Sequence, residues 1–240
     1  MKNNFFCNKP YINIYDRTSN NKKISSQILY GEKFKVIRKV KNFLKIKTSY
    51  DNYSGYIKNK KFKNKFNPTH KVKTLKTKIY KSNNFLPFSS KIQILKKNKN
   101  QIMFEKNKWI KSKDLSLINK KEKNFNKILK YYLNCRYKWG GKTFIGIDCS
   151  SLIQICYKYN NQFFPRDTKD QIKIKKGFIK KKYKKGDIIF WKGHVAFCIN
   201  SKELIHAYGP KKKVIIMPIQ KTIDLIEQTA NLKVKKIFSS

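Results

Sequence analysis

The spacing of apolar residues changes near Asn119, and this change constrains the fold more than any other feature of the chain. Before it, short runs alternate or cluster β-forming residues, as in KFKVIRKV at 33–40 and FLKIKTSY at 43–50. A turn signal, DNYSGY at 51–56, follows the second run. Short strands at close spacing with turns between them are typical of small β-barrels. The first half of the chain is therefore predicted to be all β.

Two stretches of this first half echo each other, which predicts an internal repeat. IYDRTSNN at 14–21 resembles IYKSNN at 79–84, and the later runs GYIKNKKF and KWIKSKDL also correspond. The segments KIQILKK and QIMFEKNKWI give the second copy strands of its own. We therefore expect two small β-barrels, residues 8–66 and residues 70–117, joined by the segment NPTH. The alternative is one irregular β-domain in which the echo arose by chance.

After residue 119 the apolar residues first follow the period of a helix. One face of that helix would carry the residues spaced i, i+3, i+4, i+7 and i+8, namely Phe125, Ile128, Leu129, Tyr132 and Leu133. Glycines break the next segment, YKWGGKTFIGI, and DCSSLIQICYKY then places Leu152, Cys156 and Tyr159 on one face of a second helix. Four β-rich runs follow, GDIIFW, HVAFCIN, ELIHAY and VIIMPI, and predict an antiparallel meander. Helices followed by a sheet define an α+β domain over residues 119–235.

The net charge of +45 suggests nucleic acid as a partner, but the type of basic residue argues against a specific site. Of the 58 basic residues only four are arginines, Arg17, Arg38, Arg136 and Arg166, and the lysines are scattered over every segment. Arginine is the preferred residue for bidentate contacts to phosphates and base edges. We therefore expect no specific nucleic-acid partner, and a salt-sensitive attraction to polyanions and anionic surfaces.

The cysteines and the N-terminal residues indicate a compartment. The five cysteines are an odd number and contain no C-x-x-C pair, which favours a reducing environment. The longest apolar run near the start is Phe5-Phe6-Cys7, too short for the core of a signal peptide, and no run approaches membrane-spanning length. We therefore expect a cytoplasmic protein without a membrane span, and a monomer.

Cys149 is the one cysteine at the polar start of a predicted helix, between Asp148 and Ser150. There the free N–H groups of the first turn and the helix dipole favour a thiolate, and a nearby imidazolium lowers the thiol pKa further, from about 8.5 to between about 3.5 and 7.5. His194 and His206 lie on consecutive predicted strands, which a turn near Asn200 to Glu203 would bring side by side. This set of side chains suits a Cys-His-polar triad.

Each of these residue types also has a purely structural interpretation. A cysteine on an amphipathic helix or strand is usually a small buried apolar residue, which is how we interpret Cys7, Cys135, Cys156 and Cys198. His70, in the NPTH segment, is expected to be a solvated or turn residue, and the aromatic residues Tyr137 and Trp139 are open to a simple packing role. A zinc site formed by Cys149, His194 and His206 is a further alternative, but the spacing is not one of structural zinc. We therefore expect no metal and no cofactor.

The motifs YKWGG, GIDCSSL, PRDTKDQ, GDIIFWKGHVAF and LIHAY occur in this order, and together they resemble those of the NlpC-type cell-wall cysteine peptidases. Within that family the chain is most similar to the γ-D-glutamyl-L-diamino-acid endopeptidases, or dipeptidyl-peptidases VI, which carry N-terminal bacterial SH3-like domains. The resemblance covers roughly residues 120–220. It implies a papain-like C-terminal domain after two SH3-like barrels, and the glycine-aromatic pair Gly55-Tyr56 agrees with such a barrel.

The resemblance also implies roles for individual residues. Cys149 corresponds to the nucleophile, His194 of GHVAF to the base and His206 of IHAY to the residue that orients it. Tyr137 of YKWGG corresponds to the tyrosine that polarises the scissile carbonyl together with the Cys149 N–H. Five further residues would lie on the substrate side: Asp148 and Ser150, which would bind the free α-amino group and polar backbone of the stem peptide, and Arg166, Asp167 and Thr168 of PRDT, for which a structural role is equally open.

One position departs from the family pattern, because Ser151 stands where glycine is commonest, giving DCSS for DCSG. A serine in the first turn of a helix costs little.

The resemblance implies hydrolysis of the γ-D-glutamyl to diamino-acid bond of peptidoglycan stem peptides, through an acyl-enzyme on Cys149. It also implies that the first barrel borders the cleft and excludes peptides extended beyond L-alanine, which suits turnover or recycling of murein fragments. Two other classes stay open: a non-catalytic peptidoglycan-binding module on a retired peptidase fold, and a lysine-driven nucleic-acid binder. The joint presence of Cys149, His194, His206 and Tyr137 favours the enzyme.

Overall fold

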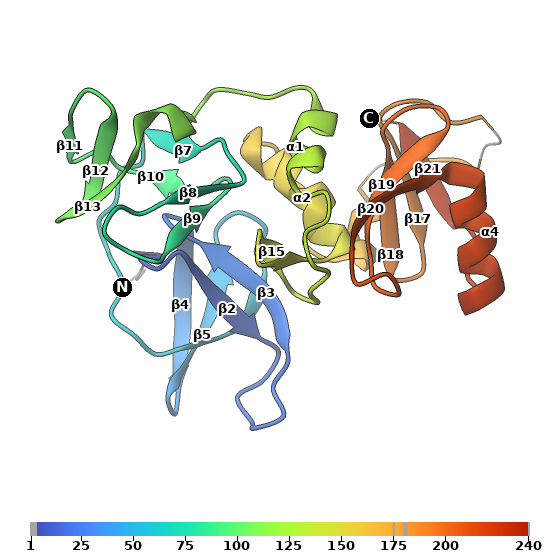
Figure 1. Cartoon of the computed structure of the whole chain (residues 1–240). Coiled ribbons are helices and arrows are strands. Elements are labelled where there is room, and N and C mark those ends of the chain that lie inside the picture. Colours follow the sequence, from blue (N-terminus) through green and yellow to red (C-terminus); the bar gives the residue numbers. More distant parts are fainter. Residues whose placement is uncertain (1–3, 175, 180–181, 240) are drawn as a thin grey trace. The chain divides into compact units, whose positions relative to one another are not determined.

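The computed structural model describes residues 4–174, 176–179 and 182–239 (Figure 1). The chain divides into two compact units. The first extends to Lys121 and includes Tyr159–Asn161; the second comprises Glu122–Lys158 and the residues from Gln162 onward. Among the described residues, no helix is both long enough and apolar enough to span a membrane.

The first half of unit 1 is a six-stranded antiparallel sheet with the strand order β1-β4-β5-β6-β2-β3. Its strands are β1 (Asn4–Phe6), β2 (Tyr11–Tyr15), β3 (Ile24–Leu29), β4 (Lys33–Val40), β5 (Phe43–Thr48) and β6 (Ser54–Lys58). The two runs predicted as strands at 33–40 and 43–50 are β4 and β5, and the predicted turn after them contains Asn52 with a φ of 56°. The core of the sheet consists of Cys7, Ile14, Ile28, Phe34, Ile46 and Ile57.

The position before the aromatic Tyr56 on β6 has no room for a side chain, which explains the glycine found there, Gly55. A Cβ atom at this position would lie 2.3 Å from Cγ2 of Ile14. Any side chain there would push β6 away from β2, whose Tyr15 pairs with Tyr56. The close approach of the two strands therefore requires glycine.

The second half of unit 1 is built from shorter strands in three small sheets, ordered β10-β7-β14, β11-β12-β13 and β8-β9. The elements are β7 (His70–Val72), β8 (Lys76–Lys78), β9 (Phe85–Pro87), β10 (Lys91–Ile92), β11 (Lys96–Lys97), β12 (Gln101–Glu105), β13 (Lys108–Lys111), the 3-10 turn η1 (Ser112–Asp114) and β14 (Leu115–Leu117). His70, expected in a turn or in solvent, instead begins β7 and is half-buried. The proposed domain boundaries at residues 66 and 70 stay a prediction.

Unit 2 contains the two predicted helices and the four predicted strands. The helices are α1 (Phe125–Tyr131) and α2 (Cys149–Tyr159), and the strands are β17 (Asp187–Trp191), β18 (His194–Cys198), β19 (Glu203–Tyr208) and β20 (Lys213–Pro218). The first helix ends earlier than its apolar pattern suggests, so that Leu133 lies beyond it and is exposed. The glycine-broken segment between the helices holds the short hairpin β15 (Lys142–Thr143) and β16 (Gly146–Ile147). This hairpin was not predicted from the sequence, and neither were α3 (Thr168–Gln171), α4 (Ile219–Ala230) and β21 (Lys236–Ser239).

Apart from the hairpin of β15 and β16, the strands described in unit 2 form one antiparallel sheet in the order β20-β19-β18-β17-β21. Helix α4 lies against one face (Figure 1), where Ile219 and Ile226 join a core with Ile189 and Ala196 of the sheet. Aromatic contacts on the opposite face include that of Phe197 with Phe125 of α1. Because both faces are covered, all five residues of β17 are buried, and its sequence DIIFW shows no polar alternation.

Candidate active site

The start of α2 is fixed by Asp148, the residue before Cys149. Its Oδ1 accepts a hydrogen bond of 2.9 Å from the backbone N–H of Ser151. A side-chain oxygen that accepts from the N–H three residues later is the usual geometry of a helix N-cap. This cap places Cys149 at the first position of the helix, as the sequence analysis predicts.

Arg166 ties the carboxylate of Asp148 to the rest of the site. Its Nη1 and Nη2 donate to Oδ1 and Oδ2 of Asp148 at 3.1 and 2.6 Å, and both side chains are almost fully buried. Nη1 also donates to Oγ of Ser150 at 2.7 Å, and the N–H of Gly140 donates to Oδ2 of Asp148 at 2.8 Å. Arg166 therefore joins the PRDT segment to the start of α2, and Asp148 joins that start to the glycine-containing loop.

The rest of the PRDTKDQ motif forms the short helix α3. Asp167 is its N-cap residue and Thr168 its first residue; burial raises the pKa of the Asp167 carboxyl. Gln171, which the sequence analysis did not select although the motif contains it, donates from Nε2 to the carbonyl oxygens of Ser150 and Pro165, each at 2.9 Å. Gln171 therefore links α3 to the first turn of α2. The sequence signal for it was its place at the end of the motif.

His194 and His206 are brought together by the register of β18 and β19. Phe197 pairs with Ile205, so that continuing this register sets His206 across from Ala196, two residues from His194 and on the same face. Such diagonal neighbours are within reach of each other across an antiparallel pair. The distance from His194 Nε2 to His206 Nδ1 is 2.9 Å, that of a hydrogen bond.

The sulfur of Cys149 lies against the backbone on both sides of His194. Sγ is 4.0 Å from the carbonyl oxygen of Gly193, and the backbone N–H of Val195 forms a hydrogen bond that favours the thiolate. The thiol and the histidine pair therefore occupy the same place in unit 2.

The protonation state of the Cys149 thiol differs from the predicted thiolate, because burial raises the thiol pKa more than the start of the helix lowers it. Burial, followed by the charge of Asp148, raises the pKa of the Cys149 thiol to about 12, although Val195, Arg166 and Ser150 act in the opposite direction. Burial also lowers the pKa of His194 to about 4 and holds that of His206 well below its usual value. The resting site therefore contains a neutral thiol and neutral imidazoles rather than a preformed thiolate.

Tyr137 lies beside this group. Burial, followed by the charges of Cys149 and Asp148, raises the pKa of its phenol, so that the hydroxyl is a hydrogen-bond donor at every physiological pH. Its backbone N–H donates to the carbonyl of Lys212 at 2.8 Å. The structure thus brings Tyr137, Cys149, His194 and His206 close together. Asp148 directly precedes Cys149, and its charge acts on both Cys149 and Tyr137.

The zinc alternative finds no support in the part of the chain that the structure describes. There, no group of three or more His, Cys, Asp or Glu side chains is arranged to hold a metal ion.

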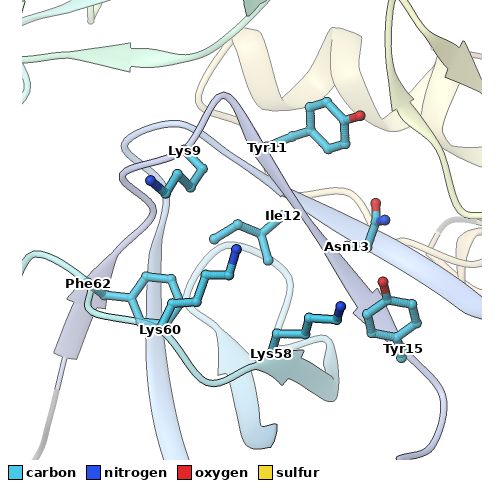
Figure 2. A pocket seen from close by; sticks show the side chains of 8 residues that line it. All are labelled: Lys9, Tyr11, Ile12, Asn13, Tyr15, Lys58, Lys60 and Phe62. Atoms are coloured by element: carbon cyan, nitrogen blue, oxygen red, sulfur yellow. The ribbon is translucent and has the colours of Figure 1, made fainter. Parts of the chain in front are cut away.

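A pocket in unit 1 contains none of the predicted site residues. It has a volume of about 270 Å³. Figure 2 shows the side chains that line it. They come from β2, from the residues just before β2, from the end of β6 and from the residues just after β6: Lys9, Tyr11, Ile12, Asn13, Tyr15, Lys58, Lys60 and Phe62. Because 58 of the 240 residues are basic, lysines are expected around any surface hollow of this chain. We assign no function to this pocket.

A cysteine that begins a helix and lies against the backbone on both sides of a histidine in the sheet, with a second histidine hydrogen-bonded to the first, is the arrangement of a papain-like domain. The comparisons identify the particular family: residues 134–229 match the NlpC/P60 family. Unit 2 therefore contains a domain of the NlpC/P60 family, a family of cysteine peptidases. Residues 14–62 match the bacterial dipeptidyl-peptidase SH3 domain, which confirms that an SH3-like domain is present there, while its predicted bounds of 8–66 stay a prediction.

Two curated relatives are similar to this chain over segments of about 80 to 100 residues. The γ-D-glutamyl-L-lysine dipeptidyl-peptidase of Bacillus subtilis (strain 168) is 32% identical over 101 residues, which are 39% of this chain and 34% of that protein. Dipeptidyl-peptidase 6 of Lysinibacillus sphaericus is 38% identical over 81 residues, 32% of this chain and 28% of that protein. The matches thus span about a third of each relative's length.

The fold of the chain also matches a solved structure. The crystal structure of an NlpC/P60 family protein from Bacillus cereus ATCC 10987 superimposes with a TM-score of 0.77 at 19% identity, over 90% of this chain and 94% of that one. This likeness and the two family matches confirm a papain-like α+β domain with an SH3 domain before it, and the second of the two predicted SH3-like barrels stays a prediction.

Proposed function

We propose that this chain is a cysteine endopeptidase that hydrolyses the bond between the γ-D-glutamyl residue and the diamino acid of peptidoglycan stem peptides. The observation that carries the proposal is the meeting of the Cys149 sulfur with the backbone around His194, whose ring is hydrogen-bonded to His206. The names of the two curated relatives support the same substrate class.

The proposed reaction begins from the neutral thiol. His194 Nε2 is occupied by His206, so Nδ1 is the nitrogen that takes the thiol proton as the Cys149 sulfur attacks the γ-carbonyl carbon of D-glutamate. The C–S bond forms, and the carbonyl oxygen becomes an oxyanion. The backbone N–H of Cys149 and the hydroxyl of Tyr137 donate hydrogen bonds to this oxyanion.

The intermediate then breaks the C–N bond. The amine of the diamino acid leaves with the proton held by His194, and a thioester remains on Cys149. A water molecule, deprotonated by His194, attacks the thioester, and the thiol regains its proton as L-Ala-D-Glu is released. His206 holds the His194 ring in position during both steps.

Asp148 and Ser150 are proposed to bind the free α-amino group of the stem peptide. The Asp148 carboxylate already accepts hydrogen bonds from Arg166, Gly140, Ser150 and Ser151, so that its remaining acceptor directions limit how an amine can approach. Arg166 supports this site from behind, and Asp167 and Thr168 position Arg166 through α3. A peptide without a free N-terminal amine should therefore be a poor substrate.

We further propose that the enzyme acts on murein fragments during turnover or recycling in the cytoplasm. The five cysteines are an odd number and contain no C-x-x-C pair, which is typical of a reducing compartment. Immunoblotting of separated cytoplasmic, membrane and extracellular fractions tests the location; a chain found mainly outside the cell would contradict it.

The decisive experiment uses L-Ala-γ-D-Glu-meso-diaminopimelate, with products identified by mass. The wild type and a control variant, Cys135→Ala, should release L-Ala-D-Glu, and Cys149→Ala should release none. The control keeps the thiol at the proposed site while removing one elsewhere. Binding of the peptide without any product from the wild type would instead favour a non-catalytic binding module.

A further inference from the structure

The second ring nitrogen of His206 faces a methionine. Nε2 of His206 lies 3.4 Å from Sδ of Met217, while Nδ1 faces His194 at 2.9 Å. His206 is fully buried, and its ring is stacked on Tyr208 with centroids 4.7 Å apart and planes at 10°. Both nitrogens of this ring therefore have one defined neighbour each.

The register of β19 and β20 explains the contact. His206 pairs with Ile215, and Leu204 pairs with Met217, so Met217 is a diagonal neighbour of His206 in the sheet. Methionine is unbranched and flexible, and can turn its sulfur toward a ring across this diagonal. A leucine would fill a similar volume without offering an acceptor.

The sulfur can accept a hydrogen bond but has no proton to donate. Nε2–H of His206 can therefore donate to Met217, whereas an unprotonated Nε2 would set its lone pair against those of the sulfur. A neutral imidazole carries one proton, so a proton on Nε2 leaves Nδ1 of His206 as an acceptor. The 2.9 Å contact then requires His194 to donate from its own Nε2.

The opposite arrangement would block the proposed base. If His206 carried its proton on Nδ1, it would donate to Nε2 of His194, and the neutral His194 would then be protonated on Nδ1. That nitrogen could no longer take a proton from Cys149. The contact between Met217 and His206 therefore determines which of the two arrangements of protons the histidine pair adopts.

We propose that Met217 is a positioning residue, whose sulfur fixes the tautomer of His206 and, through it, the tautomer of His194. It acts through the two histidines and touches no reacting atom. Its effect on catalysis rests on the proposed function, whereas its effect on the two tautomers does not. For histidine in general, the hydrogen bond made by one ring nitrogen decides whether the other nitrogen carries the proton.

The test is ¹⁵N NMR of the imidazole nitrogens, combined with peptidase kinetics. The chain has only three histidines, so His70→Gln, His206→Gln and the wild type assign the signals. In the wild type at pH 7.5, His194 and His206 should both carry their proton on Nε2. In Met217→Leu, His206 should show a substantial Nδ1–H population, and kcat should fall about fivefold, the effect of one neutral hydrogen bond, with little change in KM.

Two further variants complete the test. Met103→Leu, in unit 1, is the matched control and should change neither the tautomers nor kcat. Met217→Gln has an amide oxygen that can accept from the same N–H, and should recover most of the wild-type tautomer and rate. This recovery would not occur if the sulfur merely filled space.

The outcomes separate the two proposals. An Nδ1–H proton on wild-type His206, or unchanged tautomers in Met217→Leu, would overturn the role of Met217. The expected tautomers in a wild type that cleaves no stem peptide would uphold Met217 and refute the proposed function. If Met217→Leu does not fold, the wild-type and Met217→Gln spectra still decide the question.

Discussion

The sulfur of Cys149 lies 4.0 Å from the carbonyl oxygen of Gly193, the residue directly before His194. Two residues that are 44 positions apart in the chain, one at the start of α2 and one directly before β18, therefore meet within the motifs that contain Cys149 and His194. Solvent reaches little of this site, since Cys149 is 5% exposed, His206 is fully buried and His194 is half-buried. The reactivity of the thiol is then controlled by burial as much as by its partners.

Cys149 should react slowly with iodoacetamide at pH 6 in the folded, substrate-free protein. Its pKa of about 12 leaves far less thiolate than an unfolded-chain cysteine has, and only the thiolate reacts. We expect alkylation at least about tenfold slower than in the same protein unfolded in urea, measured by the mass of the peptide that carries Cys149. Faster alkylation than in urea would show that His194 and the helix start stabilise a thiolate after all. The half-buried Cys135 serves as the internal reference.

Acid should destabilise the protein in the range where the half-buried His194 and the fully buried His206 take up protons. The pKa of His194 is about 4 in the folded state and about 6.5 in an unfolded chain, so the folded state binds fewer protons between these values. Its contribution to stability is present above pH 6.5 and is lost as the pH falls toward 4, by on the order of 3 kcal/mol.

The measurement is the free energy of unfolding in urea at pH 7.5, 6, 5 and 4. Carboxylates titrate in the same range, so the test is a difference between variants. His194→Gln should lose less stability than the wild type over this range, because its side chain does not titrate. Equal losses in the two proteins would mean that His194 is not held neutral by burial.

The strands and helices nearest the site could be predicted from sequence because local signals define them. The meander from β17 to β20 follows from β-rich runs between turns, and α2 from an apolar face after a capping aspartate. Helix α4 also had signals that the sequence analysis overlooked: apolar residues at Ile219, Ile223 and Ile226, and Asn231 with a φ of 52° as its C-cap. Strand β21 is only four residues long and lies among lysines, so no periodicity marks it.

The chemistry of the site was less accessible to sequence reasoning. That Cys149 begins a helix is local, but how far it is buried depends on segments distant in sequence, such as Gly193 and Val195. The helix start and the expected imidazolium therefore suggested a low pKa for the Cys149 thiol, whereas burial produces a high one. The contact of Met217 with His206 depends on the register of β19 and β20, and no motif reveals it.

Arg166→Met should be strongly destabilising, because it leaves the carboxylate of Asp148 buried without its partner. Both side chains are nearly inaccessible, at 2% and 7% exposure. Removing one member of a buried ion pair typically costs about 3–5 kcal/mol. Thermal and urea unfolding should show a loss of this order, and the double variant Asp148→Asn/Arg166→Met should lose less than the single one.

The matched control is Arg17→Met. Arg17 contacts Asp16 at 3.0 Å, but the two side chains are 57% and 31% exposed. Exposed pairs contribute between about 0 and 1 kcal/mol, so this variant should be close to wild type. Similar losses in the two variants would show that burial of the Arg166 pair does not set its importance.

Ser151→Ala should keep or raise the stability of the protein, whereas Ser150→Ala should lower it. Ser151 is 1% exposed, and within the described residues its hydroxyl has no hydrogen-bond partner. The neighbouring Ser150 hydroxyl is bonded to Arg166 at 2.7 Å and to Asp148 at 3.2 Å. Removing an unpaired buried hydroxyl relieves a desolvation cost of about 1–3 kcal/mol, and alanine also favours a helix.

Ser151→Gly separates these two contributions, because it removes the same hydroxyl but lowers helix propensity by about 1 kcal/mol relative to alanine. We expect the free energy of unfolding, from urea titration at pH 7.5, to rank Ser151→Ala above Ser151→Gly, and both above Ser150→Ala. The Ser151 variants should retain peptidase activity, since that side chain makes no contact with Cys149 or Arg166 among the described interactions. A clear loss of stability in Ser151→Ala would mean that the hydroxyl has a partner, such as a buried water, that stabilises the first turn of α2.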